Sequence, residues 1–116
     1  MRVISGYLKG KNILLPSDKK TRPLKDMVRE SIFNIIEHAK SFNCNIENSK
    51  VLDLFSGTGS FGIECISRGA SQVIFNENYS LALEILKKNI YNLKCRDKCE
   101  INTHDCFNVG QLKNMH

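Results

Sequence analysis

The sequence lacks any apolar run near the ~20 residues that a membrane-spanning helix needs, and its first residues lack the apolar core of a secretory signal. Both absences predict a cytoplasmic protein without a membrane partner. The five cysteines are odd in number and form no Cys-x-x-Cys pair, which argues against a disulfide framework and for a reducing compartment. With 116 residues, of which 41% are hydrophobic, the chain is long enough for one small globular domain and too short for two.

Four side chains that can bind metal ions, Cys95, Cys99, His104 and Cys106, lie within twelve residues. Their spacing matches no zinc-site pattern that we can justify. On a strand, His104 and Cys106 would face one side, whereas Cys95 and Cys99 would precede that strand in a loop. Ordinary thiols are therefore the preferred interpretation, and we predict no metal site.

Positive charge is concentrated in the first third of the chain. Residues 1–40 hold nine Lys or Arg and four acidic residues, whereas residues 41–116 hold eight of each, so the first segment carries the whole net charge of +5. This asymmetry favours a polyanionic partner such as a nucleic acid, with an ordinary solvated surface as the alternative. Arg2, Lys9 and Lys11 are the basic residues of its first part and are predicted to contact RNA.

The first 40 residues are predicted to form a basic hairpin and a helix, as an extension that faces RNA or a cofactor. Residues 1–5 and 11–15 are expected to be short strands, followed by a polar connection that contains Pro16 and Pro23. A helix is expected to begin near Leu24. Its apolar residues recur at three- and four-residue intervals and are predicted to pack in the core: Met27 or Val28, Ile32, Ile35, Ile36 and Ala39.

Residues 41–116 are predicted to be the N-terminal half of an α/β, Rossmann-like domain. Strands are expected over residues 51–55, 72–76 and 99–104, and helices over residues 60–67 and 80–93, with Gly69 ending the first helix. Right-handed crossovers would place the three strands parallel in the order 3-2-1, which is half of a doubly wound sheet.

The stretch VLDLFSGTGSFGIE, residues 51–64, is predicted to be a nucleotide-cofactor site. Gly57 and Gly59 would let the backbone turn sharply and let a ligand approach the main chain. Three acids, Asp53, Glu77 and Asp105, follow or end the predicted strands, where ligands of such sheets bind. Glu77 lies 18 residues after Gly59, near the spacing at which an acid accepts both ribose hydroxyls.

Two cofactors are compatible with the glycine pattern. The stretch GTGSFG, residues 57–62, satisfies the dinucleotide pattern G-x-G-x-x-G, so an NAD(P)-binding protein is one alternative. Asp53 would repel a pyrophosphate but can hold the ammonium group of a methionine moiety, directly or through water. The residues therefore favour S-adenosylmethionine.

Three segments resemble, in order and spacing, a bacterial family of methyltransferases that act on the 2-amino group of a guanine in 16S ribosomal RNA: MRVISGYLKGKNI, TRPLKDMVRESIFNII and VLDLFSGTGSFGIECISRGA. The resemblance implies a seven-stranded Rossmann-like fold, S-adenosylmethionine as the methyl donor, and 16S ribosomal RNA or the assembling small subunit as the partner. By position it implies contacts of Asp53, Gly57 and Gly59 with the methionine part, of Glu77 with the ribose, and of Asp105 and the Cys106 amide with the adenine. It also implies that Thr21, Arg22 and Arg29 lie near the cofactor or the RNA.

The chain departs from that family in one catalytic motif. Such enzymes use an Asp/Asn-Pro-Pro-aromatic motif after the fourth strand, and a chain with only Pro16 and Pro23 cannot build it, so no catalytic residue is predicted. The family usually has an apolar residue and an acid where this chain has Asn76 and Tyr79. We therefore expect a truncated or interrupted version of a longer enzyme. The alternative is an inactive fragment that retains a cofactor half-site and a basic face.

Overall fold

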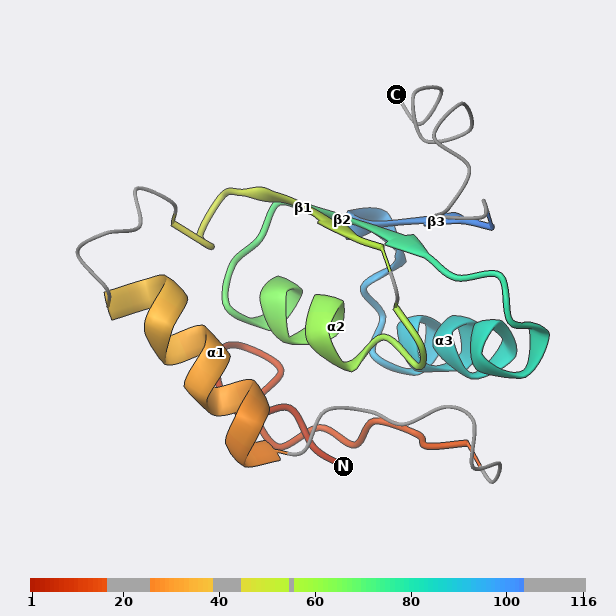
Figure 1. Ribbon diagram of the computed structural model, residues 1–116, viewed down its shortest axis with the longest axis horizontal. Coiled ribbons are helices and arrows are strands. Elements are labelled where there is room, and N and C mark those ends of the chain that lie inside the picture. Colours follow the sequence, from red (N-terminus) through yellow and green to blue (C-terminus); the bar gives the residue numbers. More distant parts are fainter. Residues whose placement is uncertain (17–25, 39–44, 55, 104–116) are drawn as a thin grey trace.

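Three parallel strands form the sheet around which the protein is built (Figure 1). The computed structural model describes residues 1–16, 26–38, 45–54 and 56–103. The strands are β1 (Lys50–Asp53), β2 (Gln72–Asn76) and β3 (Cys99–Asn102), in the order β1-β2-β3. The predicted Rossmann-like order of the first three strands is therefore confirmed.

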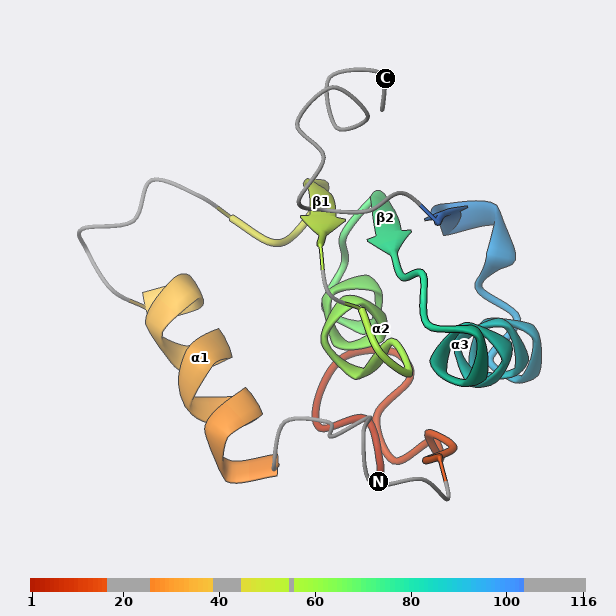
Figure 2. The ribbon, with the colours of Figure 1, turned by 45° about the vertical axis from the view of Figure 1, so that its right-hand side comes forward.

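The two faces of the sheet differ in burial because alternate residues of a strand point to opposite sides. Val73 and Phe75 of β2 are fully buried, whereas Leu52 of β1 keeps 52% of its surface exposed. The helices α2 (Ser60–Ser67) and α3 (Ser80–Asn92) cover the same face of the sheet (Figure 2). The core therefore lies between this face and the two helices.

Both helices end as their sequences predict, within one residue. At the end of α2, Gly69 takes a φ of +108° and its N–H donates to the Ile66 carbonyl, while the Ala70 N–H donates to the Cys65 carbonyl. This is the Schellman pattern, in which a left-handed residue, here Gly69, satisfies the last helical carbonyls.

The described helices are all too short or too polar to cross a membrane.

The N-terminal hairpin forms, but its two predicted strands do not. The described residues show only an isolated antiparallel bridge between Arg2 and Asn12. The intervening loop instead bonds to the end of α2: the Tyr7 N–H donates to the Ser67 carbonyl, and the Leu8 N–H donates to the Ser67 hydroxyl. The two arms keep a few bonds to each other, such as the Val3 N–H to the Lys11 carbonyl, and the bonds to the helix end hold the loop between them.

The first helix, α1 (Asp26–His38), turns a different side to the core than its sequence predicts. The exposed fractions of Met27, Val28 and Ile35 are 79%, 45% and 54%, so the prediction that they pack in the core is wrong. The buried apolar residue is Phe33, whose ring stacks on the Phe61 ring at 4.9 Å. Ile36 does pack against the core and Ile32 is partly buried, so the prediction holds for this part of the stripe. Ala39 lies outside the described residues.

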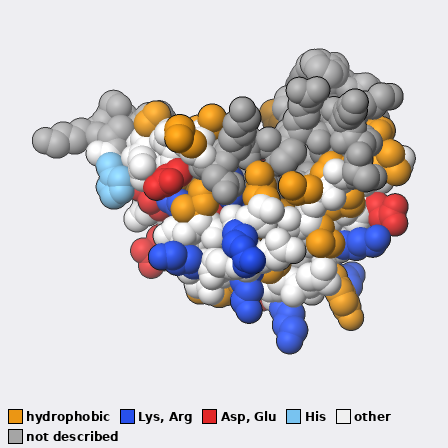
Figure 3. Space-filling view, turned by 90° about the horizontal axis from the view of Figure 1, so that it is seen from below, with side chains coloured by type: hydrophobic (Ala, Val, Ile, Leu, Met, Phe, Trp, Pro, Cys, Tyr) orange, Lys and Arg blue, Asp and Glu red, His pale blue; other side chains and the backbone are white. Residues whose placement is uncertain are grey.

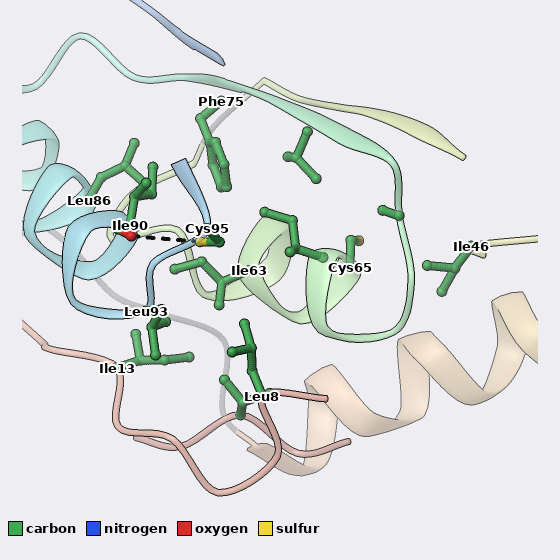
Figure 4. Packing of buried hydrophobic residues seen from close by; sticks show 14 of the residues in the cluster. Leu8, Ile13, Ile46, Ile63, Cys65, Phe75, Leu86, Ile90, Leu93 and Cys95 are labelled. Atoms are coloured by element: carbon green, nitrogen blue, oxygen red, sulfur yellow. Dashed lines mark hydrogen bonds between the residues drawn. The ribbon is translucent and has the colours of Figure 1, made fainter. Parts of the chain in front are cut away.

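The hairpin contributes to the same core as the sheet (Figure 4). Leu8 and Ile13 pack beside Ile63 of α2 and Leu93 at the end of α3. The first sixteen residues thus form a third layer beneath the helices.

Two hairpin glycines provide a matched test of this layer. Both have positive φ values, +89° for Gly6 and +83° for Gly10, but a Cβ on Gly6 would lie 1.9 Å from the Ser67 carbonyl oxygen, whereas a Cβ on Gly10 would meet nothing within 4 Å. We expect Gly10→Ala to cost about 1 kcal/mol of unfolding free energy from the left-handed backbone alone. Gly6→Ala should cost about 1–3 kcal/mol more because of the clash. Urea unfolding measures both, and equal losses would contradict the close contact.

Candidate cofactor-binding site

The loop between β1 and α2 makes the sharp turn that its glycines predict. Gly57 and Gly59 have φ values of +56° and +92°, and the Gly59 N–H donates to the Ser56 carbonyl at 2.8 Å. A Cβ on Gly59 would lie 2.4 Å from Cδ1 of Leu86. Gly59 is thus required for the turn and for packing against α3, and its contact with a cofactor stays a prediction.

Glu77 joins the end of β2 to this loop. One of its carboxylate oxygens accepts the Gly57 N–H at 2.7 Å, and the other accepts the Tyr79 N–H at 3.0 Å. Each oxygen keeps further acceptor capacity, and the side chain is only partly buried. The structure therefore fixes the orientation of a carboxylate that can still accept hydroxyl groups.

Asp53 ends β1 at the same edge of the sheet. It is partly buried, and its carbonyl accepts the Ser56 hydroxyl at 3.0 Å. Burial raises the pKa of the Cys65 thiol to about 12, and the charges of Asp53 and Glu64 add to this rise. Asp53 shares one face of β1 with Val51, which packs against the core, so its side chain lies on the helix side of the sheet. Cys65 is a neutral thiol at pH 7.

Two buried amide side chains hold the loop from its other sides. Asn76, which stands where the resembled family usually has an apolar residue, is 1% exposed and donates to the Leu54 carbonyl at 3.3 Å. Asn89 of α3 donates to the Thr58 carbonyl at 2.9 Å and accepts the Leu14 N–H at 2.7 Å. The polar residue at position 76 therefore ties β2 to the end of β1 instead of disrupting the sheet.

Several predicted residues lie outside the described part of the chain. These are Asp105 and Cys106, predicted to contact the adenine, Thr21 and Arg22, predicted to lie near the cofactor or the RNA, and His104, one of the four metal candidates.

The Sγ atoms of Cys95 and Cys99, two other metal candidates, are 3.9 Å apart, and the Cys99 thiol donates to the Cys95 carbonyl at 3.1 Å. Within the described residues, no three metal-binding side chains come together.

Arg29 does not lie on an RNA-binding surface, so this part of the prediction is corrected. Its side chain has no exposed surface, and its Nη2 donates to the Arg2 carbonyl at 2.6 Å. Its Nη1 lies 3.7 Å from a carboxylate oxygen of Glu64, which is also fully buried. The guanidinium faces the interior because a buried carboxylate there requires a positive partner.

Glu64 is the residue that sequence reasoning missed. Its carboxylate accepts the Ile4 N–H at 2.8 Å, the Ser5 N–H at 3.0 Å and the Nε of Arg68 at 2.9 Å. Together with Arg29 it connects the hairpin, α1 and α2. An ionisable residue inside the otherwise uncharged helix SFGIECIS was the available clue.

Arg2, Lys9 and Lys11 are exposed on the hairpin, and Arg2 donates to the Gly10 carbonyl at 2.8 Å. Figure 3 shows Lys and Arg side chains gathered on the face of the molecule that carries this hairpin. Their contact with RNA stays a prediction.

Comparison with known proteins gives consistent similarities. The pattern of the family described as Conserved hypothetical protein 95 matches residues 1–115. Ribosomal RNA small subunit methyltransferase D of Haemophilus influenzae is 36% identical over 95 residues, which cover 82% of this chain and 46% of the relative. The protein of the same name from Escherichia coli K12 is 30% identical over 116 residues, which cover 100% of this chain and 56% of the relative. The solved structure of Escherichia coli yhhF, provisionally described as a methyltransferase, has a TM-score of 0.77 and 26% identity. The match covers 94% of this chain and 55% of that structure. The chain spans about half the length of these relatives.

The buried charges of Glu64 give a prediction with an internal control. Glu64→Gln removes the carboxylate that faces buried Arg29 and should cost about 3–5 kcal/mol of unfolding free energy. Glu84→Gln removes the exposed pair with Lys88, which has the same four-residue spacing as the Glu64–Arg68 pair. That loss should be below about 0.5 kcal/mol. Urea unfolding of the two variants checks this, and similar midpoints would contradict the role of Glu64.

Proposed function

Because the chain belongs to the family described as Conserved hypothetical protein 95, we propose that it binds S-adenosylmethionine and takes part in methylating the 2-amino group of a guanine in 16S ribosomal RNA. The named relatives are small-subunit ribosomal RNA methyltransferases, which supports the reaction class. The observation that carries the cofactor is the hydrogen bond from the Gly57 N–H to Glu77, which sets a carboxylate beside the glycine turn.

The described residues fit the chemical groups of this cofactor. Glu77 would accept the two ribose hydroxyls with the acceptor capacity that Gly57 and Tyr79 leave open. Asp53, at the end of the neighbouring strand, would offset the positive charge of the methionine ammonium group. Gly57 would allow close approach rather than donate, because its N–H already bonds to Glu77. Asp105 and the Cys106 amide remain the proposed adenine contacts.

The role of these residues would be positioning. When bound, S-adenosylmethionine would supply an electrophilic methyl group on its sulfonium sulfur. Asp53 would hold the methionine part of the donor and Glu77 its ribose, which together would fix the position of the sulfonium group between them. Alignment of a nucleophile with its target is among the largest contributions that a protein can make to such a transfer.

The same geometry argues against a dinucleotide cofactor. The phosphates of NAD(P) need free backbone amides at such a glycine loop. Here the Gly57 amide donates to Glu77 at 2.7 Å, so a phosphate at this amide would meet a carboxylate. S-adenosylmethionine has no phosphate and avoids this repulsion.

Cofactor binding can be tested directly. We expect isothermal titration of the 116-residue chain to show binding of S-adenosylmethionine but not of NAD. Glu77→Gln should weaken binding about fivefold or more, because the amide loses the charge and one acceptor oxygen. Glu100→Gln, an exposed change on β3, is the control and should leave the affinity unchanged. A preference for NAD, or equal affinity of all three proteins for S-adenosylmethionine, would contradict the proposed site.

Methyl transfer needs a separate experiment, since a cofactor-binding half-site without catalysis is the second candidate. It is favoured because Pro16 and Pro23 are not adjacent, so these 116 residues cannot form the Asp/Asn-Pro-Pro-aromatic motif. If the residues present here suffice, labelled methyl groups should pass from S-adenosylmethionine to 16S ribosomal RNA, as N2-methylguanine detected by mass spectrometry. Cofactor binding without transfer would instead support the half-site.

A further inference from the structure

A groove runs along the outer side of α3, formed by residues of α3, β3 and the 3-10 helix η1 (Arg96–Lys98) between them. Its volume is about 580 Å³, within the range of small-molecule sites. Ile90 and Ile101 give it an apolar floor, and its walls include Lys87, Lys88, Tyr91 and Arg96. None of these residues belongs to the candidate cofactor site.

Tyr91 is the unusual wall residue because a large aromatic side chain stays mostly exposed there. It is 79% exposed, whereas its neighbour Ile90 is 3% exposed in the core. An aromatic ring at the wall of an open groove offers a flat face on which a base of a single strand can stack, and such stacking tolerates any base.

The charge around the groove favours a polyanion. Residues 84–98 contain five basic and two acidic residues, although residues 41–116 as a whole are balanced. One of those acids, Glu84, pairs with Lys88 at 3.6 Å. The acids that balance the second part of the chain therefore lie mainly elsewhere in its sequence, and the groove has a local excess of positive charge.

The groove segment also adjoins the basic hairpin. The Lys98 Nζ lies 4.8 Å from the centre of the Tyr7 ring. Asn89 of α3 bonds to both backbone groups of Leu14, with distances of 2.7 and 3.2 Å. The hairpin that these contacts hold against α3 and η1 also carries the exposed residues Lys9 and Lys11.

We propose that this groove binds one nucleotide of single-stranded RNA, with its base stacked on Tyr91 and its flanking phosphates near Lys87, Lys88 and Arg96. From the groove, the RNA strand continues toward the hairpin. The inference rests on the proposed function in taking RNA as the substrate. It adds a contact remote from the guanine that would receive the methyl group, because the groove lies along α3 and not at the carboxyl ends of β1 and β2.

The test uses the 116-residue chain and a fluorescein-labelled single-stranded RNA of twelve nucleotides, with binding followed by fluorescence anisotropy. Tyr91→Ala should weaken binding at least about fivefold, the lower limit for one lost base–aromatic stack, and Tyr91→Phe should restore it. Arg96→Gln should reduce the slope of log K against log salt by about 0.7, as expected for one lost phosphate contact on a single strand. Lys50→Gln is the matched control, an exposed cation on β1 that should leave the Tyr91-dependent binding intact.

Three results would overturn the proposal that the groove binds RNA: unchanged binding in Tyr91→Ala, an unchanged salt slope in Arg96→Gln, or competition by polyglutamate as strong as that by unlabelled RNA. The last would indicate an acidic protein partner. Thermal unfolding verifies that each variant is folded, and if Tyr91→Ala is not, the Arg96→Gln slope decides. Titration of S-adenosylmethionine into the same samples separates the two proposals. If S-adenosylmethionine does not bind but RNA binding still depends on Tyr91, the proposed methyltransferase function is contradicted and the proposed RNA contact at the groove is kept.

Discussion

The buried carboxylate of Glu64 is the interaction on which the described structure depends most. A charge without solvent contact costs several kcal/mol unless neighbouring groups compensate it. Glu64 meets this requirement with two N–H groups of the hairpin, Arg68 directly after its own helix and Arg29 of α1. The hairpin, α1 and α2 must therefore assemble together. Since α2 begins at the glycine turn, the same network also positions the candidate cofactor site.

That site is held in shape by side chains that the chain brings from several directions. Glu77 bonds to Gly57, Asn76 to Leu54, and Asn89 to Thr58. These bonds fix the loop through contacts between residues 20 to 31 positions apart in the sequence. A loop fixed in this way loses little freedom when a ligand binds, which lowers the entropic cost of binding.

The proposed RNA contacts and the proposed cofactor contacts lie in different parts of the fold. The carboxyl ends of β1 and β2 carry Asp53 and Glu77, whereas the groove follows α3 and joins the hairpin through Lys98 and Tyr7. RNA affinity and donor affinity can therefore be altered independently. The sequence assigns the net positive charge to the first third of the chain, and Arg96 of η1 adds an exposed cation at the groove.

The sequence by itself determined the order of the sheet strands and the bounds of the elements around the glycine turn. Residue periodicity gave α2, β2 and α3 within one residue, and the left-handed preference of Gly69 placed a helix end, because both depend on local backbone geometry. It also placed Gly57 and Glu77 at one edge of the sheet. Only the tertiary structure decided that Arg29 is buried, that Met27 and Ile35 are exposed, and that Glu64 holds three segments together. Burial depends on which surfaces meet across 27 to 62 residues of chain, and no local pattern encodes that meeting.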